Sequence, residues 1–398
     1  MRFKHRLKNF WQELDKTIIF VLLFALLSRL FVLGAGLYFT KAQVSGNFTD
    51  QLTQTWVQWD GEWYRDIINN GYDQDFPNVP PSDESCNLGL GLCQRNFAFF
   101  PLFPLSVKLV QLLIPLPAEV LGLILSNLYF VLGTLLLYFL AKEFFGKRKA
   151  FLICVIAMVF PASYVFSGLM SESLFYLLLV LCYYLAHKKH WLAAGLVGGL
   201  LSATRIIGIL VMVSLLLLFW EQNRDKAKWQ RLLNLKLLLT LALVPAGLLF
   251  FMLFLQNHTG DALAFLRIQD YWEKSVGNLN PLAGIITALI NFQVEGSFKN
   301  HLYNLAYFIG TMLLFIWNLL KKLLPFSLSS MLLWILVPLS AGTTLALPRY
   351  LLPLFPVYLI AGIILSKNKY LAALYLLASS LLLLYLTNLY VNGNFLTA

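Results

Sequence analysis

The chain has 398 residues, 59% of them hydrophobic and 12% charged, and its mean hydropathy is +0.72. This composition excludes a soluble globular protein and is typical of polytopic helical membrane proteins, because each bilayer crossing needs about 20 mostly apolar residues. The net charge of +11 does not indicate a nucleic-acid-binding protein, because the basic residues form small clusters between apolar runs, as the positive-inside rule predicts.

The first apolar run, 17–39, is predicted to be a retained transmembrane helix. It is longer than the core of a signal peptide, and no small-residue cleavage pattern follows it. The basic residues before it predict a cytoplasmic N-terminus: Arg2, Lys4, Arg6, Lys8 and Lys16. The region 41–119 is therefore expected to be a large first outer loop. Arg29, near the middle of the run, is expected to have an acidic partner, either Asp60 or Glu172.

The outer loop is the most acidic part of the chain, since eight of the 19 acidic residues lie between Lys41 and Phe97. Cys86 and Cys93 both fall in this loop. They could form a small disulfide if the loop faces an oxidising compartment.

A short amphipathic helix is predicted over 60–70, lying along the outer membrane interface. Trp59, Trp63 and the pair at 67–68 recur at helical spacing. Asp60 begins this helix, where it is either an N-cap or a general base near the membrane surface. Trp59, Trp63 and Tyr64 are either an aromatic belt or a wall whose flat faces suit sugar rings.

The segment 97–116 contains three prolines and is expected not to cross the membrane. If it crossed, every later basic cluster would lie on the outer side. If it lies in the interface or re-enters, those clusters become cytoplasmic, so we prefer the second alternative.

The remaining apolar runs predict ten further spans, which gives about eleven crossings in a single domain covering 1–398. They are 120–141, 150–168, 170–187, 191–204, 206–220, 236–256, 301–320, 323–345, 350–366 and 370–391. A second outer loop is expected at 257–300. No internal repeat of the kind found in inverted-repeat transporters is present.

Several short motifs resemble, in order, those of the PIG-V-like mannosyltransferases of the glycosyltransferase-C superfamily. The run at 59–72, Trp-Asp-Gly-Glu-Trp-Tyr-Arg-Asp-Ile-Ile-Asn-Asn-Gly-Tyr, is similar to the family signature WDxxWYxxIAxxGY. The further matches are 99–104, 161–162 with 171–175, 202–205 with Gly208, 260–265 and 348–350. The resemblance extends from about residue 20 to residue 360.

This resemblance implies an all-α, GT-C-like bundle that moves a mannose from a polyprenyl-phosphate donor to an acceptor at the non-cytoplasmic face. It implies inversion at the anomeric carbon, no nucleotide-sugar site, and Asp60 as the base. Two departures from the family pattern are present. Trp63 stands where eukaryotic members tend to have His, which makes a GPI precursor a doubtful acceptor and a lipid-linked or glycan acceptor the broader expectation. Phe103 stands where Tyr is usual.

Three charged residues in apolar surroundings are candidate ligands of the substrate. Glu172 either complements the start of a helix or accepts hydrogen bonds from a sugar or acceptor and holds an arginine. Arg205 and Arg349 are expected at the outer face, where they either snorkel or bind the donor phosphate. Asp261, in the second outer loop, is expected to cap a short helix.

No metal-ligand spacing and no Gly-rich phosphate loop are present, so we expect catalysis without a metal ion or cofactor. The expected partners are the polyprenyl-phosphate sugar donor, the acceptor and membrane lipids, and not nucleic acid. The alternative class is a transporter or lipid flippase, in which the charges of Arg29 and Glu172 would line a path through the membrane.

Overall fold

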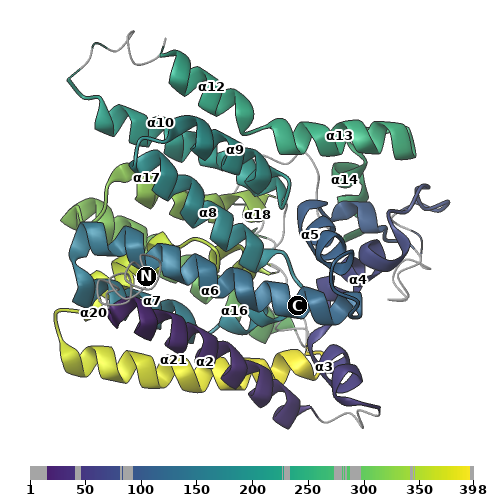
Figure 1. Ribbon diagram of the computed structural model, residues 1–398, viewed down its shortest axis with the longest axis horizontal. Helices are drawn as coiled ribbons and strands as arrows, with labels where there is room; N and C mark the ends of the chain where they lie inside the picture. The colour runs from purple at the N-terminus through teal and green to yellow at the C-terminus, as the bar shows by residue number, and fades with distance from the viewer. Residues whose placement is uncertain are drawn as a thin grey trace, which may run out of the picture.

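A computed structural model describes residues 16–40, 46–80, 83, 93–225, 227, 234–272, 280, 282, 285–286, 297–340, 344 and 346–394. All regular secondary structure in these ranges is helical. Long helices lie side by side, and the short helices α3, α4, α5 and α14 gather at one end of the bundle, on the right of Figure 1. We call this end the α4 end.

The described helical segments overlap each of the eleven predicted spans, but those at 150–168 and 350–366 are shorter than predicted. They are α2 (Lys16–Phe39), α6 (Ala118–Phe145), α7 (Lys147–Val159), α8 (Glu172–His187), α9 (Trp191–Ser202), η4 with α10 (Ile206–Leu210, Val211–Gln222), α12 with α13 (Leu235–Leu243, Ala246–Thr259), α16 (Ser297–Lys321), α17 with η7 and α18 (Phe326–Ser329, Ser330–Ile335, Leu336–Ser340), α20 (Pro356–Leu365) and α21 (Lys369–Val391). Among the described residues, five stretches are long and apolar enough to cross a membrane by themselves, and the others are shorter. The prediction of an all-α polytopic membrane protein is confirmed.

Short helices form the α4 end. They are α3 (Phe48–Trp56), α4 (Asp60–Asn70), η2 (Asn96–Ala98), α5 (Leu102–Gln111), α14 (Ala264–Arg267) and η5 (Ile268–Trp272). The 10 residues of α5 extend for about 15 Å, about half the thickness of a bilayer core. Cys93 is disulfide-bonded, whereas Cys86 and much of 257–300 lie outside the described residues.

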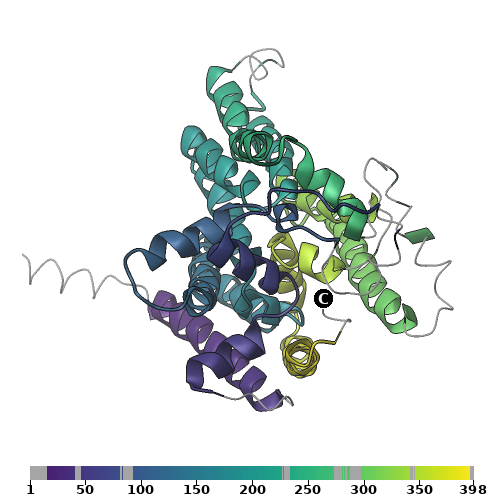
Figure 2. The same ribbon diagram turned by 90° about the vertical axis from the view of Figure 1, so that its right-hand side faces the viewer.

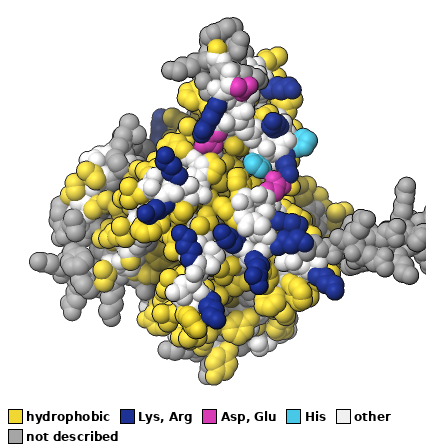
Figure 3. All heavy atoms as spheres, turned by 90° about the vertical axis from the view of Figure 1, so that its left-hand side faces the viewer, with side chains coloured by type: hydrophobic (Ala, Val, Ile, Leu, Met, Phe, Trp, Pro, Cys, Tyr) yellow, Lys and Arg dark blue, Asp and Glu magenta, His cyan; other side chains and the backbone are white. Residues whose placement is uncertain are grey.

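The opposite end of the bundle is basic. Figure 3 looks onto it and shows many lysine and arginine side chains among hydrophobic ones, with only a few acidic side chains. The ends of the long helices and the turns between them carry these basic residues: Lys142, Lys147, Arg148, Lys149, Lys188, Lys189, Arg224, Lys321, Lys322, Lys367 and Lys369. The two ends of the bundle therefore differ strongly in charge.

The chain is interrupted between α7 and α8, inside the bundle. Pro161 lacks the amide hydrogen that would continue α7, and residues 162–171 are all buried. The five-residue 3₁₀ helix η3 (Ser163–Ser167) occupies this break. Glu172, the first residue of α8, is thereby placed well inside the protein.

Arg29 contacts this break instead of an acidic residue. Its guanidinium donates to the carbonyl oxygens of Ser163 (2.6 Å) and Met158 (3.0 Å) and to the hydroxyl of Ser163 (2.8 Å). No ion pair of Arg29 is present among the described residues, so the expected pairing with Asp60 or Glu172 is wrong. Carbonyls freed by the helix break satisfy this buried cation.

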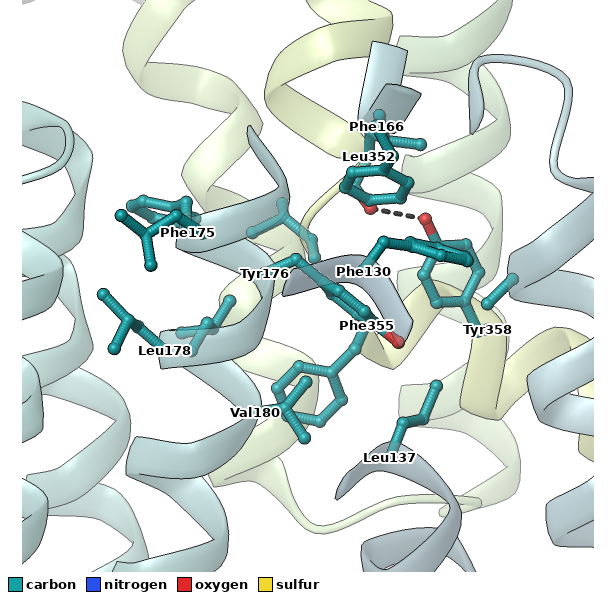
Figure 4. Close-up of a cluster of buried hydrophobic side chains, with 14 of the residues drawn as sticks. Phe130, Leu137, Phe166, Phe175, Tyr176, Leu178, Val180, Leu352, Phe355 and Tyr358 are labelled. Atoms are coloured by element: carbon teal, nitrogen blue, oxygen red, sulfur yellow. Dashed lines mark hydrogen bonds between the residues drawn. The ribbon is translucent and has the colours of Figure 1, made fainter. Parts of the chain in front are cut away.

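An aromatic core lies next to the break. Figure 4 shows Phe130 of α6, Phe166 of η3 and Tyr176 of α8 close together, with Tyr358 of α20 beside them. The ring centroids of Phe130 and Phe166 are 4.8 Å apart, and the hydroxyl of Tyr358 donates to the carbonyl of Leu352. These contacts fix α6, α8 and α20 around the interrupted segment.

Helices α9 and α13 approach so closely that a β-carbon on Gly247 would lie 2.0 Å from the carbonyl oxygen of Gly199. We therefore expect Gly247→Ala to lower the free energy of unfolding by about 1–3 kcal/mol, because rigid backbone would have to move. Gly310→Ala, on α16 with nothing within 4 Å of its added β-carbon, is the matched control and should not destabilise. Thermal unfolding in detergent measures both, and equal midpoints would contradict this packing.

Candidate active site

Asp60 is the first residue of α4, at the α4 end. The residue at the N-cap position is Trp59, so the expectation that Asp60 is an N-cap is wrong. Trp59 has a φ of +54°, a backbone conformation that costs a bulky residue about 1–3 kcal/mol. The carboxylate of Asp60 forms an ion pair with the guanidinium of Arg349, 289 residues further along the chain.

Glu172 is the centre of the charged cluster. Its Oε1 accepts hydrogen bonds from Nε (3.0 Å) and Nη2 (2.8 Å) of Arg349 and from Nη1 of Arg205 (2.6 Å). Its other oxygen, Oε2, is buried and accepts no hydrogen bond from any described residue. Two carboxylates and two guanidinium groups thus form one connected set, Asp60, Arg349, Glu172 and Arg205, which we call the charged cluster.

The four members differ in their access to solvent, and this difference divides their roles. The side chains of Asp60 and Arg205 are 26% and 15% exposed, whereas those of Arg349 and Glu172 are 6% and 0% exposed. A ligand entering from the α4 end therefore meets Asp60 and Arg205 first. Arg349 and Glu172 lie behind them and hold them in position.

The local backbone conformation sets the orientation of both arginine side chains, Arg349 and Arg205. Arg349 lies on α19 (Leu347–Leu351), which begins directly after Ala346. The φ of Ala346 is +60°, which, like that of Trp59, is unusual for a residue with a β-carbon. Arg205 follows the end of α9 in an extended conformation. Its guanidinium carbon lies 5.0 Å from the ring centroid of Tyr350, a cation–π contact that the sequence analysis did not foresee.

The predicted aromatic wall divides into an open part and a buried part. Trp63 is partly exposed and stacks on Phe99, with ring centroids 6.1 Å apart. Tyr64 is 3% exposed, and it meets Phe99 and Phe103 edge-on at 5.4 and 5.1 Å. Burial raises the pKa of Tyr64, so its hydroxyl stays protonated and donates to Ser171 Oγ at 2.8 Å. Tyr64 thus joins α4 to the residue before Glu172.

Asn96 is buried and was also missed, because nothing in its sequence surroundings marks it. Its amide donates to Asp66 Oδ2 (2.6 Å) and to the carbonyl of Gly71 (2.9 Å), and its backbone amide donates to Asp73 Oδ2 (3.0 Å). These bonds fasten the later part of the outer loop to the end of α4. Asp261 accepts from the backbone amide of Leu263 (2.9 Å), but Leu263 is the N-cap of α14 and no side-chain cap hydrogen bond is present, so the predicted capping role of Asp261 is wrong.

An apolar cavity of about 730 Å³ lies between α4 and α5 on one side and α9 and α13 on the other. Its lining includes Tyr72, Leu102, Leu105, Leu196, Leu200, Phe250, Phe251 and Phe254. Leu200 and Phe250 are 45% and 72% exposed, so the cavity opens on the apolar side of the bundle. Lys108 is the charged residue in its wall, and Ala203, two residues before Arg205, also lines it.

No group of three or more potential metal ligands occurs among the residues that the structure describes. The predicted site residues Arg205, Arg349, Asp60 and Glu172 lie near one another, because direct hydrogen bonds link all four. Trp59 precedes Asp60 in the sequence. Tyr64 donates to Ser171, the residue before Glu172.

No protein-family model and no curated protein matches the chain. Among solved structures, it is similar to the oligosaccharyltransferase of Archaeoglobus fulgidus in complex with zinc and sulfate, with a TM-score of 0.50 and 15% identity over 94% of this chain and 53% of that one. It is also similar to ArnT from Cupriavidus metallidurans bound to undecaprenyl phosphate, with a TM-score of 0.52 and 13% identity over 96% of this chain and 76% of ArnT. The chain spans about half the length of the archaeal enzyme.

At these identities the likeness concerns the fold. The chain therefore has the predicted all-α, GT-C-like helical bundle. The archaeal enzyme is also matched as a complex with an inhibitory peptide and a dolichol-phosphate, with a TM-score of 0.50 and 14% identity over 96% of this chain and 56% of that one.

Proposed function

We propose that the protein is an inverting glycosyltransferase that moves a mannose or similar hexose from a polyprenyl-phosphate donor to a lipid-linked or glycan acceptor. The observation that carries the proposal is the charged cluster at one end of an apolar bundle. In it a partly exposed carboxylate, Asp60, is connected through Arg349 and Glu172 to a partly exposed guanidinium, Arg205. The solved structures of similar fold include ArnT with undecaprenyl phosphate and the archaeal enzyme with dolichol-phosphate. Within this proposal, the motif resemblance favours a PIG-V-like mannosyltransferase.

Asp60 is the general base in this mechanism. It removes the proton of an acceptor hydroxyl while that oxygen attacks the anomeric carbon of the donor sugar. The bond from the anomeric carbon to the phosphate oxygen breaks on the opposite face, and the polyprenyl phosphate leaves. A single displacement of this kind inverts the configuration at the anomeric carbon, and no covalent enzyme intermediate is formed.

Arg205 and Arg349 neutralise the donor phosphate. Arg205 is the more exposed of the two and contacts the phosphate first. Planar guanidinium groups bind phosphate bidentately, and fixed donors in a poorly hydrated site favour the charge that develops on the leaving group. Glu172 is buried and acts by holding both arginines, and the partly exposed ring of Trp63 contributes to the sugar or acceptor subsite.

The apolar cavity holds the first part of the prenyl chain. It reaches Ala203, close to Arg205 in sequence, and its aromatic and leucine side chains offer a water-poor surface facing the bilayer. A phosphate at Arg205 with its chain in this cavity is the arrangement that an amphiphilic donor requires. Burial of the chain then supplies affinity, and the charged cluster selects the bond that breaks.

The active site faces the non-cytoplasmic side in this proposal. The basic face of Figure 3 lies at the end opposite α4, and the positive-inside rule assigns a basic face to the cytoplasm. Donor phosphate and acceptor would then meet at the outer leaflet.

Arg205→Ala is expected to raise the donor KM or Kd by about tenfold or more, because charge-assisted hydrogen bonds contribute roughly 1.5–3 kcal/mol each. Arg65→Ala is the matched control, since Arg65 is a half-exposed arginine of α4 whose ion pair is with Glu62, outside the charged cluster. Titration of each purified variant with a polyprenyl-phosphate sugar measures the effect. Unchanged donor affinity in Arg205→Ala would show that Arg205 does not bind the donor.

The assay that tests the function is transfer of a radiolabelled sugar from a polyprenyl-phosphate donor to candidate acceptors by the purified protein. A new glycosidic bond is expected. A transporter or flippase would make none, so a labelled donor that stays intact in the presence of every acceptor class would exclude the enzyme proposed here.

A further inference from the structure

The break between α7 and α8 lies deep in the bundle, level with Arg29. Arg29 stands 13 residues after Lys16, and α7, which starts at the same basic end, is 13 residues long. Both distances correspond to about 20 Å of helix, short of a bilayer core of about 30 Å. Irregular backbone at such a depth is stable only where protein groups satisfy it.

Arg29 is the main donor to this backbone. Its side chain is buried, as are those of Ser163 and Ser167. Besides the bonds to Met158 and Ser163 described above, it reaches Ser167 Oγ at 3.4 Å, and its guanidinium carbon lies 4.3 Å from the ring centroid of Phe130. The hydroxyl of Ser167 in turn donates to Asn127 of α6 at 2.9 Å. One cation therefore ties the end of α7 and the whole of η3 to α2 and α6.

The segment fixed by Arg29 leads directly into the charged cluster. Ser173 donates back to the carbonyl of Phe166 at 2.8 Å, which sets where α8 begins relative to η3. Ser171 accepts the hydroxyl of Tyr64 from α4, and Glu172 follows it and binds both arginines. The position of the Glu172 carboxylate, and through Arg349 that of Asp60, thus depends on the conformation of 160–171.

We propose that Arg29 is a positioning residue of the active site: from the first span it fixes the buried 160–171 segment that places Glu172, and thereby orients Arg205, Arg349 and Asp60. This inference rests on the transferase function proposed above. It assigns to Arg29 a role at a distance, without contact to the donor or acceptor. Displacements of about 1 Å at a reacting centre can cost roughly 100-fold in rate.

The test compares Arg29→Lys with Ser379→Ala. Ser379 of α21 donates to the carbonyl of Val159 at 2.7 Å, so it also holds the end of α7, but its hydroxyl forms no hydrogen bond with the described residues of η3. Lysine keeps the positive charge but cannot reproduce the planar fork that reaches Met158 and Ser163 together. For Arg29→Lys we expect kcat to fall by about tenfold or more while the donor KM changes less than threefold, because the guanidinium of Arg205 and the apolar cavity are both still present to bind the donor.

Ser379→Ala should lower the thermal midpoint by a few degrees and leave kcat within about twofold of the unmodified protein. Ser163→Ala removes one acceptor of Arg29, the Ser163 hydroxyl, and keeps both carbonyl acceptors. It should also lower kcat, and it tests the proposal if Arg29→Lys does not fold. If kcat falls in proportion to the loss of thermal midpoint in all three variants, Arg29 has only a structural role and the inference is wrong. If the unmodified protein itself transfers no sugar, the proposed function fails instead.

Discussion

Asp60→Asn is expected to lower kcat by about 100- to 10,000-fold, the range by which general bases accelerate proton transfer. Asparagine has nearly the same shape but cannot take a proton from the acceptor. Donor binding should be retained, because Arg205 and the apolar cavity are unchanged and Arg349 keeps its bonds to Glu172. Single-turnover transfer and donor titration with the purified variant separate the two effects.

The matched control for this prediction is Glu62→Gln. Glu62 is a carboxylate two residues further along α4, but it pairs with Arg65 and is 47% exposed. Its loss should change kcat by less than about twofold. A near-normal rate in Asp60→Asn, or an equal loss in both variants, would show that Asp60 is not the base.

Glu172→Gln is expected to have the largest effect on stability. The same oxygen of Glu172 accepts from two arginines, so neutralising it leaves two buried or half-buried cations facing only Asp60. Breaking a buried ion pair by removing one partner typically costs about 3–5 kcal/mol. We therefore expect a strongly lowered thermal midpoint and no transfer activity.

A second substitution separates stability from function in this case. The double variant Glu172→Gln with Arg205→Met restores the balance of charge, and its thermal midpoint should recover most of the loss. Transfer activity should not recover, because Arg205 is then missing from the phosphate subsite. If the double variant is no more stable than Glu172→Gln alone, charge imbalance is not the reason for the loss.

The sequence allowed most helices of the bundle to be predicted, because long apolar runs separated by basic turns leave few alternatives. The bounds of α4 were also predictable. Trp and Ile side chains recur at helical spacing from residue 60, and Gly71, with a φ of +87°, ends the helix after Asn70. The depth of the α7–α8 break was not predictable, because it depends on which carbonyls Pro161 leaves free and which side chain reaches them.

For the charged cluster, the sequence marked the four residues as candidates and allowed Glu172 to hold an arginine, but it did not specify which carboxylate pairs with which arginine. Charges in apolar runs are conspicuous, and this marked Glu172, Arg205 and Arg349. Their pairing joins residues up to 289 positions apart, and no local pattern specifies it. The expected partner of Arg29 was wrong for the same reason: backbone carbonyls are acceptors at every position, and only the fold decides which of them are exposed to a cation.

The ion pair between Asp60 and Arg349 couples the protonation of Asp60 to the charge on the donor phosphate during the proposed reaction. Before transfer, the two carboxylates balance the two guanidinium groups. When Asp60 takes the acceptor proton it becomes neutral, and Arg349 loses one of its two anionic partners. At that moment the donor phosphate changes from a diester to a monoester and gains negative charge. The enzyme therefore acquires one unit of positive charge as its leaving group acquires negative charge, without moving any helix.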